Sequence, residues 1–383
     1  MEINEIKVHF IILPFVGDFR HSMKTDAFSS NVVVELIAEN GEVRGYGEGA
    51  PRLYVTGESQ ASIPESIKFF LNNRSFPWTL QCISQIWDYV DRLPDGRERN
   101  SALCALEMAM LDVMGKSEGR SMIEYFAKDF VCDSVHYGAA LPLAGKEKIV
   151  EASEMAKRMG IRRVKLKMGA DFFQNQQALD AVREVFGEHC DLKVDANGAW
   201  DRELAFQHVP FAAEYRIRVF EQPLMPNDGD IGEVAKSLKA MGVKVMADES
   251  ACSFHEVKAL VEEGHYNMVN VRLSKCGGFR KSLRIIDFLR REGIPFQVAC
   301  QLGESGILSA AGRILSLLCR DALYHDGSYD DFLLRENVTK QNVSFGPGGQ
   351  AGPLGGVGLG VEVSGSNLRR LSRGLDPISF KRP

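Results

Sequence analysis

Short apolar runs recur between residues 135 and 330, and each is followed by a stretch with helical periodicity. The polar residues that close six successive runs, from Lys167 to Gln301, are 26 to 28 residues apart. A fixed period in this range indicates a repeat, and strand alternating with helix at this spacing is the unit of a closed parallel barrel. The eight runs therefore predict an α/β fold with a modified (β/α)8 TIM-type barrel, and they are VHYGAAL, RRVKLKM, DLKVDAN, IRVFEQP, VKVMADES, YNMVNVRLSK, PFQVACQLGES and ALYHDGSYDD.

The chain before the barrel has a different pattern. Residues 31–50 predict a hairpin of two strands with a turn at Asn40 and Gly41. Apolar residues at helical spacing predict a helix over 101–119. Two glycine-rich stretches, 45–50 and 345–363, are interpreted as turns. We predict an α+β domain at 1–130, the barrel at 131–335, and a tail at 336–383 that returns to the first domain.

Each predicted barrel strand is apolar in its body and polar at its carboxyl end, which is the end where barrels of this kind carry their chemistry. Asp195, Glu221 and Asp248 close three consecutive strands. Each acid, taken singly, is explained by capping of the helix that follows. Three carboxylates converging on one point instead favour a hard divalent cation, and oxygen ligands suit Mg²⁺.

Lysines flank these acids on the neighbouring strands. Lys165 and Lys167 share one face of the second strand because side chains alternate along a strand, and Lys275 closes the sixth. A solvated strand face is the simple explanation of the pair. At a barrel mouth, we expect the two ammonium groups to lower each other's pKa, which would suit a general base. Strands two and six are opposite in an eight-stranded ring, so a bound substrate would have an amine on each side.

Composition narrows the classes of function. The net charge is −5, with no basic stripe interleaved with aromatic residues, which argues against a nucleic-acid partner. The amino terminus does not resemble a signal peptide, and the sequence contains no apolar stretch of membrane-spanning length. The eight cysteines include no C-x-x-C pair, which is typical of free thiols in a reducing cytoplasm. We expect a cytoplasmic protein with no membrane partner.

These motifs together resemble the enolase superfamily, within it the muconate-lactonizing-enzyme subgroup. The segment GYGEGAPRLYVTGES (45–59) looks like the capping-domain segment of dipeptide epimerases. The resemblance implies an α+β capping domain over a modified barrel, closed by loops near 15–30 and 50–58, and a homo-oligomer is expected. The motifs that carry it are KLK at 165–167, DAN at 195–197, EQP at 221–223, ADES at 247–250 and KCGG at 275–278.

The resemblance also implies roles for individual residues. Asp195, Glu221 and Asp248 match the ligands of Mg²⁺, and Lys167 and Lys275 match the two acid/base lysines, with Lys165 beside them. Asn197 and Glu249 match positions that orient ligands or lysine. Thr56, in the second closing loop, is a further candidate for substrate binding.

The eighth strand departs from the family pattern. Dipeptide epimerases usually end it in Asp-x-Asp, which holds the α-ammonium of the substrate, and the matching positions here are Ser328 and Asp330. Asp326 and Asp331 are possible substitutes for the missing acid. This favours an N-blocked amino acid or another carboxylate over a free dipeptide amine. Glu304, near the end of the seventh strand, is either an acid on the substrate side or a helix-capping acid.

Three functions follow from this pattern. The first is a Mg²⁺-dependent epimerase or racemase that removes the α-proton of an amino-acid or dipeptide carboxylate and forms an enediolate stabilised by the metal. The second is a cycloisomerase or a syn-dehydratase on the same scaffold, with one lysine as base. The third is a protein that only binds ligands, and the retained lysines and acids argue against it.

Overall fold

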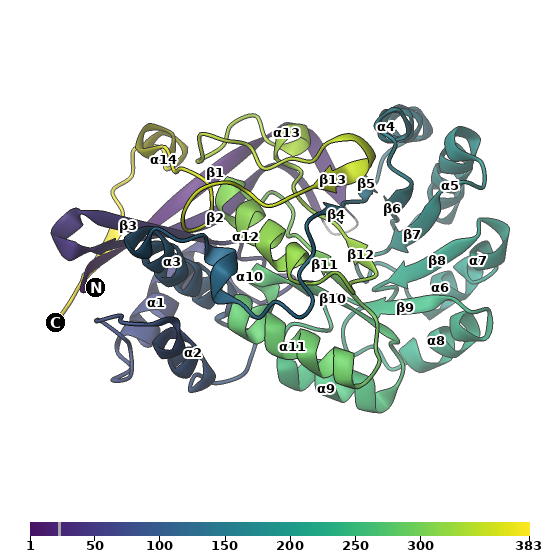
Figure 1. Ribbon diagram of the computed structural model, residues 1–383. Helices are drawn as coiled ribbons and strands as arrows, with labels where there is room; N and C mark the ends of the chain where they lie inside the picture. The colour runs from purple at the N-terminus through teal and green to yellow at the C-terminus, as the bar shows by residue number, and fades with distance from the viewer. Residues whose placement is uncertain (22–23) are drawn as a thin grey trace.

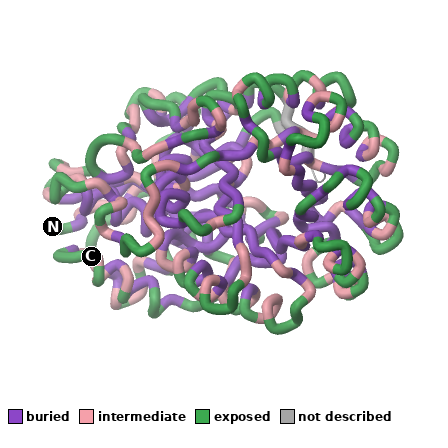
Figure 2. The backbone as a smooth tube through the Cα atoms, turned by 45° about the vertical axis from the view of Figure 1, so that its right-hand side comes forward, coloured by how far each residue is buried: buried purple, intermediate pink, exposed green. Residues whose placement is uncertain are grey.

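The computed structural model describes residues 1–21 and 24–383, and all of their side chains except those of 18–26. Within the predicted closing loop at 15–30, residues 22–23 therefore lie outside the described residues. An antiparallel sheet with helices packed around it forms one end of the molecule, and a parallel barrel wrapped by helices forms the other (Figure 1). Buried residues are concentrated along the strands and the sheet-facing helices (Figure 2).

The antiparallel sheet has the strand order β14-β1-β2-β3. The predicted turn at Asn40 and Gly41 is confirmed as a short 3-10 helix between β2 and β3. The last strand pairs with the first, so the two termini lie at the same end of the molecule (Figure 1). The predicted domain boundaries near 130 and 335 remain predictions. The elements of this part are β1 (Ile3–His21), β2 (Lys24–Ala38), β3 (Val43–Gly49), α1 (Ile63–Leu71), α2 (Ile83–Asp91), α3 (Asn100–Glu118), α14 (Gly365–Leu371) and β14 (Ile378–Lys381).

The glycines at 45–50 do not form the predicted turn. Gly45, Gly47 and Gly49 lie in β3, where α3 packs directly against the strand. A Cβ atom at Gly47 would lie only 2.0 Å from the carbonyl oxygen of Ala105. The glycines are thus required by the close approach of helix and strand rather than by a change of chain direction. The predicted helix over 101–119 is confirmed as α3, which ends at Gly119 in the left-handed conformation.

The eight apolar runs form the predicted barrel. Its strands are hydrogen-bonded in chain order, and the ring closes through a parallel bridge between Tyr137 and His325. Each of the first seven barrel strands is followed by at least one helix. Between the last barrel strand and β13 (Gln350–Ala351) the only α-helix is the four-residue α13, so the barrel departs here from the regular alternation of strand and helix. The strands are β5 (Ala139–Leu141), β6 (Arg163–Lys167), β7 (Asp191–Asp195), β8 (Ile217–Glu221), β9 (Lys244–Ala247), β10 (Met268–Arg272), β11 (Phe296–Ala299) and β12 (Tyr324–His325).

The longer helices of the barrel lie on its outer side (Figure 1), while the four-residue α10 and α13 lie at the carboxyl ends of their strands. A separate two-stranded sheet, β4 (Val135–His136) with β13 (Gln350–Ala351), lies beside the entry to the first barrel strand. The helices are α4 (Lys146–Arg158), α5 (Phe172–Phe186), α6 (Arg202–His208), α7 (Phe211–Glu214), α8 (Ile231–Ala240), α9 (Phe254–Glu263), α10 (Leu273–Cys276), α11 (Phe279–Arg291), α12 (Gly306–Leu317) and α13 (Asp330–Leu333).

The antiparallel domain contacts the barrel at the loop between β11 and α12. The guanidinium of Arg52 donates to the carbonyl oxygen of Leu302 at 2.6 Å. Buried Glu48 accepts hydrogen bonds from the backbone N–H groups of Ser305 and Leu308 and from the Ser305 hydroxyl, at the start of α12. The first domain therefore holds in place a loop at the carboxyl end of the barrel strands.

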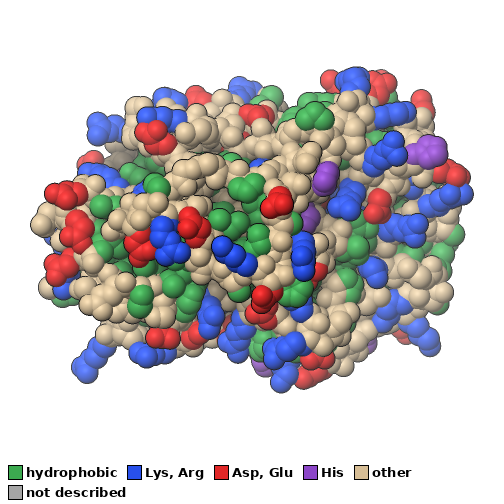
Figure 3. All heavy atoms as spheres, viewed as in Figure 1, with side chains coloured by type: hydrophobic (Ala, Val, Ile, Leu, Met, Phe, Trp, Pro, Cys, Tyr) green, Lys and Arg blue, Asp and Glu red, His purple; other side chains and the backbone are tan. Residues whose placement is uncertain are grey.

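No helix among the described residues is both long enough and apolar enough to cross a bilayer. On the face in view, acidic and basic side chains are interspersed, in keeping with the small net charge (Figure 3).

Candidate active site

The three predicted metal ligands lie together at the carboxyl ends of adjacent strands. Asp195 ends β7, Glu221 ends β8, and Asp248 follows the last residue of β9. The register pairs Lys167 with Asp195 and Asp195 with Glu221, so these residues lie at one level of the barrel. All three carboxylates are buried. Buried carboxylates are stable only with cations or hydrogen-bond donors beside them.

The predicted acid/base lysines contact these acids from two sides. The Lys167 ammonium donates to Asp195 Oδ2 at 2.6 Å and to Asn197 Oδ1 at 2.8 Å. The Lys275 ammonium donates to Asp248 Oδ1 at 3.0 Å and to the Asn270 carbonyl at 2.6 Å. Lys275 lies on α10, one turn beyond β10, and burial lowers its pKa. Four strand positions separate β6 from β10 in the ring of eight, so the two lysines approach from opposite sides.

The two lysines of β6 share the inner face, while the apolar Val164 and Leu166, which alternate with them, face the surrounding helices and are fully buried. The Lys165 ammonium lies 3.0 Å from Asp326 Oδ2 and 3.3 Å from Glu221 Oε2. Burial alone would lower its pKa, but the carboxylates around it outweigh burial, and the pKa of Lys165 is raised. The prediction of a pKa lowered by repulsion from Lys167 is therefore wrong for Lys165, because acids surround this ammonium more closely than cations do.

Asn197 and Glu249 connect the lysine to the acids. The Asn197 amide donates to Glu249 Oε1 at 2.9 Å while its oxygen accepts from Lys167. Burial, and then the charge of Asp195, raise the pKa of Glu249 to about 6. Asn197 thus hydrogen-bonds to both the Lys167 ammonium and Glu249, and its predicted orienting role stays a prediction.

The acids fit a divalent cation by their chemistry. Glu221 Oε2 and Asp248 Oδ2 are buried, and their charges are met by ion pairs with Lys165 and Arg272 rather than by hydrogen bonds of regular geometry. Oxygen atoms of this kind are the donors that Mg²⁺ prefers. Within the described residues, no group of three His, Cys, Asp or Glu side chains is already assembled around a metal position. The space between the carboxylates is filled by the chain's own cations, which are Lys165, Lys167, Arg272 and Lys275.

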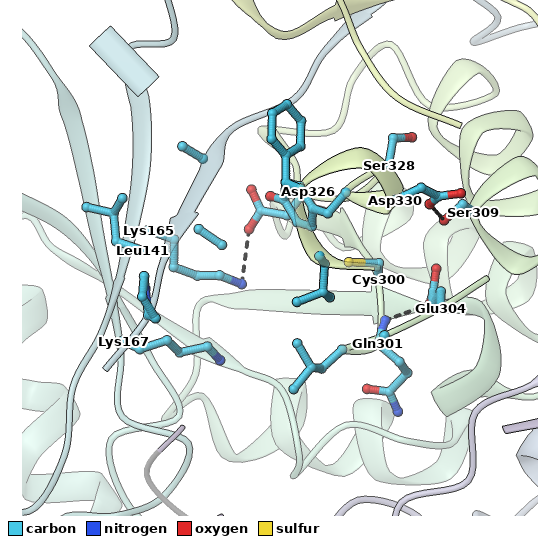
Figure 4. Close-up of a pocket in the computed structure, with 18 of the residues that line it drawn as sticks. Leu141, Lys165, Lys167, Cys300, Gln301, Glu304, Ser309, Asp326, Ser328 and Asp330 are labelled. Atoms are coloured by element: carbon cyan, nitrogen blue, oxygen red, sulfur yellow. Dashed lines mark hydrogen bonds and ion pairs between the residues drawn. The ribbon is translucent and has the colours of Figure 1, made fainter. Parts of the chain in front are cut away.

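A cavity of about 330 Å³ is lined by Lys165, Lys167, Asn197, Glu249 and Arg272. The three acids and Lys275 are not part of its lining. Lys165 and Lys167 point into it from one wall, and residues 300–304 with 326–330 form the facing wall (Figure 4). Much of the remaining lining is apolar and comes from α4, α13 and the first barrel strand. Its larger apolar side chains are Leu141, Met155, Met159, Phe332 and Phe345. The cavity therefore suits a molecule with a charged end at the lysines and an apolar body.

The predicted substrate-binding residues reach the cavity, with one exception. Glu304, Ser328, Asp330 and Asp326 line it, whereas Thr56 is buried away from its lining and Tyr54 contributes instead. Glu304 accepts from the backbone N–H of Gln301 at 2.6 Å, and burial raises the pKa of its carboxyl well above the usual value.

The acids of the eighth strand already have partners within the chain (Figure 4). Asp326 pairs with Lys165 and with buried Lys193, each at 3.0 Å. Asp330 accepts from the Ser309 hydroxyl at 2.6 Å and from the Asn337 amide at 2.7 Å. Asp331 is exposed and accepts from Asn342. Neither Asp326 nor Asp330 presents a carboxylate to the cavity without a partner.

Two residues of the site were missed from the sequence. Arg272 and Asn270 lie on the inner face of β10, where Asn270 donates to Glu221 Oε1 at 2.7 Å and Arg272 contacts Asp248. The signal was present, because these polar residues alternate with Val269 and Val271 in an otherwise apolar run. The same alternation in DLKVD places Lys193 inside the barrel.

Comparison with known proteins agrees with this geometry. A family model described as "Enolase C-terminal domain-like" matches residues 148–367, more than half of the chain. A hydrophobic dipeptide epimerase from Enterococcus faecalis is 27% identical over 321 residues, covering 81% of this chain and 86% of the relative. An o-succinylbenzoate synthase from Bacillus subtilis is 25% identical over 387 residues, covering 98% of each chain.

Solved structures show the same fold. The crystal structure of an N-succinyl Arg/Lys racemase from Bacillus cereus has a TM-score of 0.86 at 22% identity and covers 100% of both chains. A dipeptide epimerase from Enterococcus faecalis, solved with Mg and the dipeptide L-Leu-L-Tyr, has a TM-score of 0.82 at 24% identity, covering 94% of this chain and 100% of that one. The predicted resemblance is confirmed, and the chain belongs to the enolase C-terminal domain-like family as an enzyme of the enolase superfamily.

Proposed function

We propose that this enzyme is a Mg²⁺-dependent racemase or epimerase that exchanges the α-proton of an amino-acid carboxylate. One observation carries the proposal: Lys167 and Lys275 approach the three acids from opposite sides of the barrel. Inversion at a carbon needs an acid/base group on each face, and two lysines supply this. A single ammonium beside the acids would support only retention of configuration.

Each residue has a stated task. Asp195, Glu221 and Asp248 would hold Mg²⁺, which supplies positive charge where the substrate carboxylate becomes more negative. As a neutral amine, Lys167 takes the α-proton from one face, and Lys275, as an ammonium, gives a proton to the other face; the reverse reaction exchanges these two states. Asn197 orients the Lys167 ammonium, since it accepts its hydrogen bond at 2.8 Å.

We further propose that the substrate nitrogen is uncharged, as in an N-acyl amino acid, and that the substrate carries an apolar group. Asp326 and Asp330 are engaged inside the chain, so a free α-ammonium would find no unpaired carboxylate on the eighth strand. The apolar side chains of α4 and α13 support an apolar body. A buried, unpaired ammonium would be costly, which favours the acylated class.

A second candidate is a lyase or cycloisomerase reaction, in which one lysine is the base and the other only stabilises charge. The o-succinylbenzoate synthase relative aligns over nearly the whole chain, and an amine-free carboxylate fits the same cavity. The two candidates differ in stereochemistry. Only the racemase or epimerase inverts the α-carbon.

The test is a panel of N-acyl amino acids and free dipeptides incubated with enzyme and Mg²⁺ in heavy water. The proposal predicts loss of the α-proton NMR signal together with formation of the opposite configuration, first for apolar N-acyl amino acids. Loss of water or ring formation without inversion would favour the second candidate. Exchange confined to free dipeptides would contradict the N-acyl assignment.

A further inference from the structure

Arg272 joins two of the acids assigned to Mg²⁺. It is the last residue of β10, is 6% exposed, and lines the cavity. Its Nη2 atom contacts Asp248 Oδ2 and lies 3.5 Å from Glu221 Oε1. Its Nη1 atom donates to Gln301 Oε1 at 2.8 Å. One guanidinium therefore contacts the carboxylates that a divalent cation would need.

Lys165 also contacts two of the acids, but it has a further acidic partner. If the acids bound a metal, Lys165 would still be paired with Asp326 at 3.0 Å. Within the described residues, the ion-pair partners of Arg272 are Glu221 and Asp248, and its buried Nε atom donates to no acceptor. A metal bound by these acids would remove both ionic partners of Arg272 at once.

We infer that Arg272 is an internal counter-ion that competes with the divalent metal for Asp248 and Glu221. Without metal, its charge stabilises two buried carboxylates that would otherwise repel each other. With metal, a guanidinium this close would face a second cation in a site of low dielectric, so its contacts with the acids must loosen. The residue thus lowers metal affinity and stabilises the metal-free enzyme. This inference rests on the metal assignment in the proposed function.

The test measures metal binding directly. Free Mn²⁺ is followed by electron paramagnetic resonance during titration of the parent, Arg272→Gln, Arg272→Lys and Arg218→Gln. Arg218 is exposed on β8 and serves as the control for loss of one positive charge. We expect Arg272→Gln to bind Mn²⁺ about tenfold more tightly or better. Arg272→Lys should gain less, because one ammonium cannot span both carboxylates, and Arg218→Gln should match the parent.

A second readout uses thermal unfolding. Saturating Mg²⁺ should raise the melting temperature of Arg272→Gln more than that of the parent, because the metal-free variant has lost its counter-ion. If Arg272→Gln does not fold, the comparison is made with Arg272→Lys instead. Unchanged or weaker Mn²⁺ binding in the Arg272 variants would overturn the inference. Glu221→Gln, titrated in parallel, separates the inference about Arg272 from the metal assignment. If Glu221→Gln weakens Mn²⁺ binding and the Arg272 variants do not strengthen it, the inference is wrong and the metal assignment stands. If Glu221→Gln has no effect on Mn²⁺ binding, both the inference and the metal assignment are wrong.

Discussion

At the scale of the residue, the chemistry of this site depends on which buried acid each buried lysine is paired with. The sequence predicts that Lys165 and Lys167 perturb each other, yet an acid is the nearest ion-pair partner of each ammonium: Asp326 at 3.0 Å for Lys165 and Asp195 at 2.6 Å for Lys167. Sequence alternation correctly placed both lysines on one face. It could not show the contact between Lys165 and Asp326, which lies 161 positions further along the chain, because that contact depends on closure of the barrel.

The metal assignment predicts a loss of affinity when Glu221 is changed. Glu221→Gln removes one anionic ligand of three while keeping the side-chain shape, so Mg²⁺ should bind about tenfold more weakly or worse. Isothermal titration calorimetry measures this, with Glu214→Gln as the control, since Glu214 is exposed at the end of α7. A Glu221 variant with the affinity of the parent would remove Glu221 from the ligand set.

Because Asp330 is already hydrogen-bonded within the chain, we predict that it does not distinguish amine-bearing from N-acyl substrates. Its carboxyl, whose pKa burial raises to about 6, is occupied by Ser309 and Asn337. Asp330→Asn should therefore change the apparent KM for amine-bearing and N-acyl substrates by the same factor, within about threefold. Steady-state kinetics on a matched pair of substrates measures this. A rise in KM confined to the amine-bearing substrate would show that Asp330 binds the ammonium after all.

At the scale of the element, the period of the apolar runs located the eight barrel strands, because each strand must be apolar outside to pack on its helix. The prediction of a turn at the glycines of 45–50 is wrong. Glycine is required both in tight turns and where a helix packs closely on a strand, as α3 does on β3, so the residue type alone does not distinguish them. The long pairing of β1 with β2 was also missed. Only 3D contact shows which strand a long apolar segment joins.

Helix α3 also reaches the barrel through Glu107. This fully buried carboxyl accepts hydrogen bonds from the backbone N–H groups of Phe279 and Arg280 at the start of α11. Burial is the main cause that raises its pKa from 4.5 to about 8. Between these values the folded protein holds a proton that the unfolded chain releases. Its contribution to stability is therefore complete below pH 4.5 and is lost as the pH rises through about 8.

Glu107→Gln should remove this part of the pH dependence. The melting temperature of the parent should fall between pH 5 and pH 8.5 by more than that of the variant, which has no titrating group at this position. Scanning calorimetry across this range measures the difference, with the exposed Glu118→Gln on the same helix as control. If Glu107→Gln keeps the slope of the parent, the carboxyl does not titrate in this window.

At the scale of the whole molecule, the site is built by ring closure. The strand order places β6 and β10 four positions apart, and the acids of β7, β8 and the β9 end lie on the arc between them. The sequence predicted this arrangement because barrel order follows chain order. It could not predict the partners of Asp326 and Asp330, which set the expected class of substrate, because those contacts come from side-chain packing in three dimensions.

The central claim is that the two lysines act on opposite faces of one carbon. Its most direct test is proton NMR in heavy water on each pure enantiomer of a turned-over substrate, with the parent, Lys167→Ala and Lys275→Ala. We expect both variants to lose inversion, while each still exchanges the α-proton of one enantiomer, a different one in each variant. The opposite result, in which one variant loses exchange with both enantiomers and the other keeps both, would contradict the claim and leave a single base.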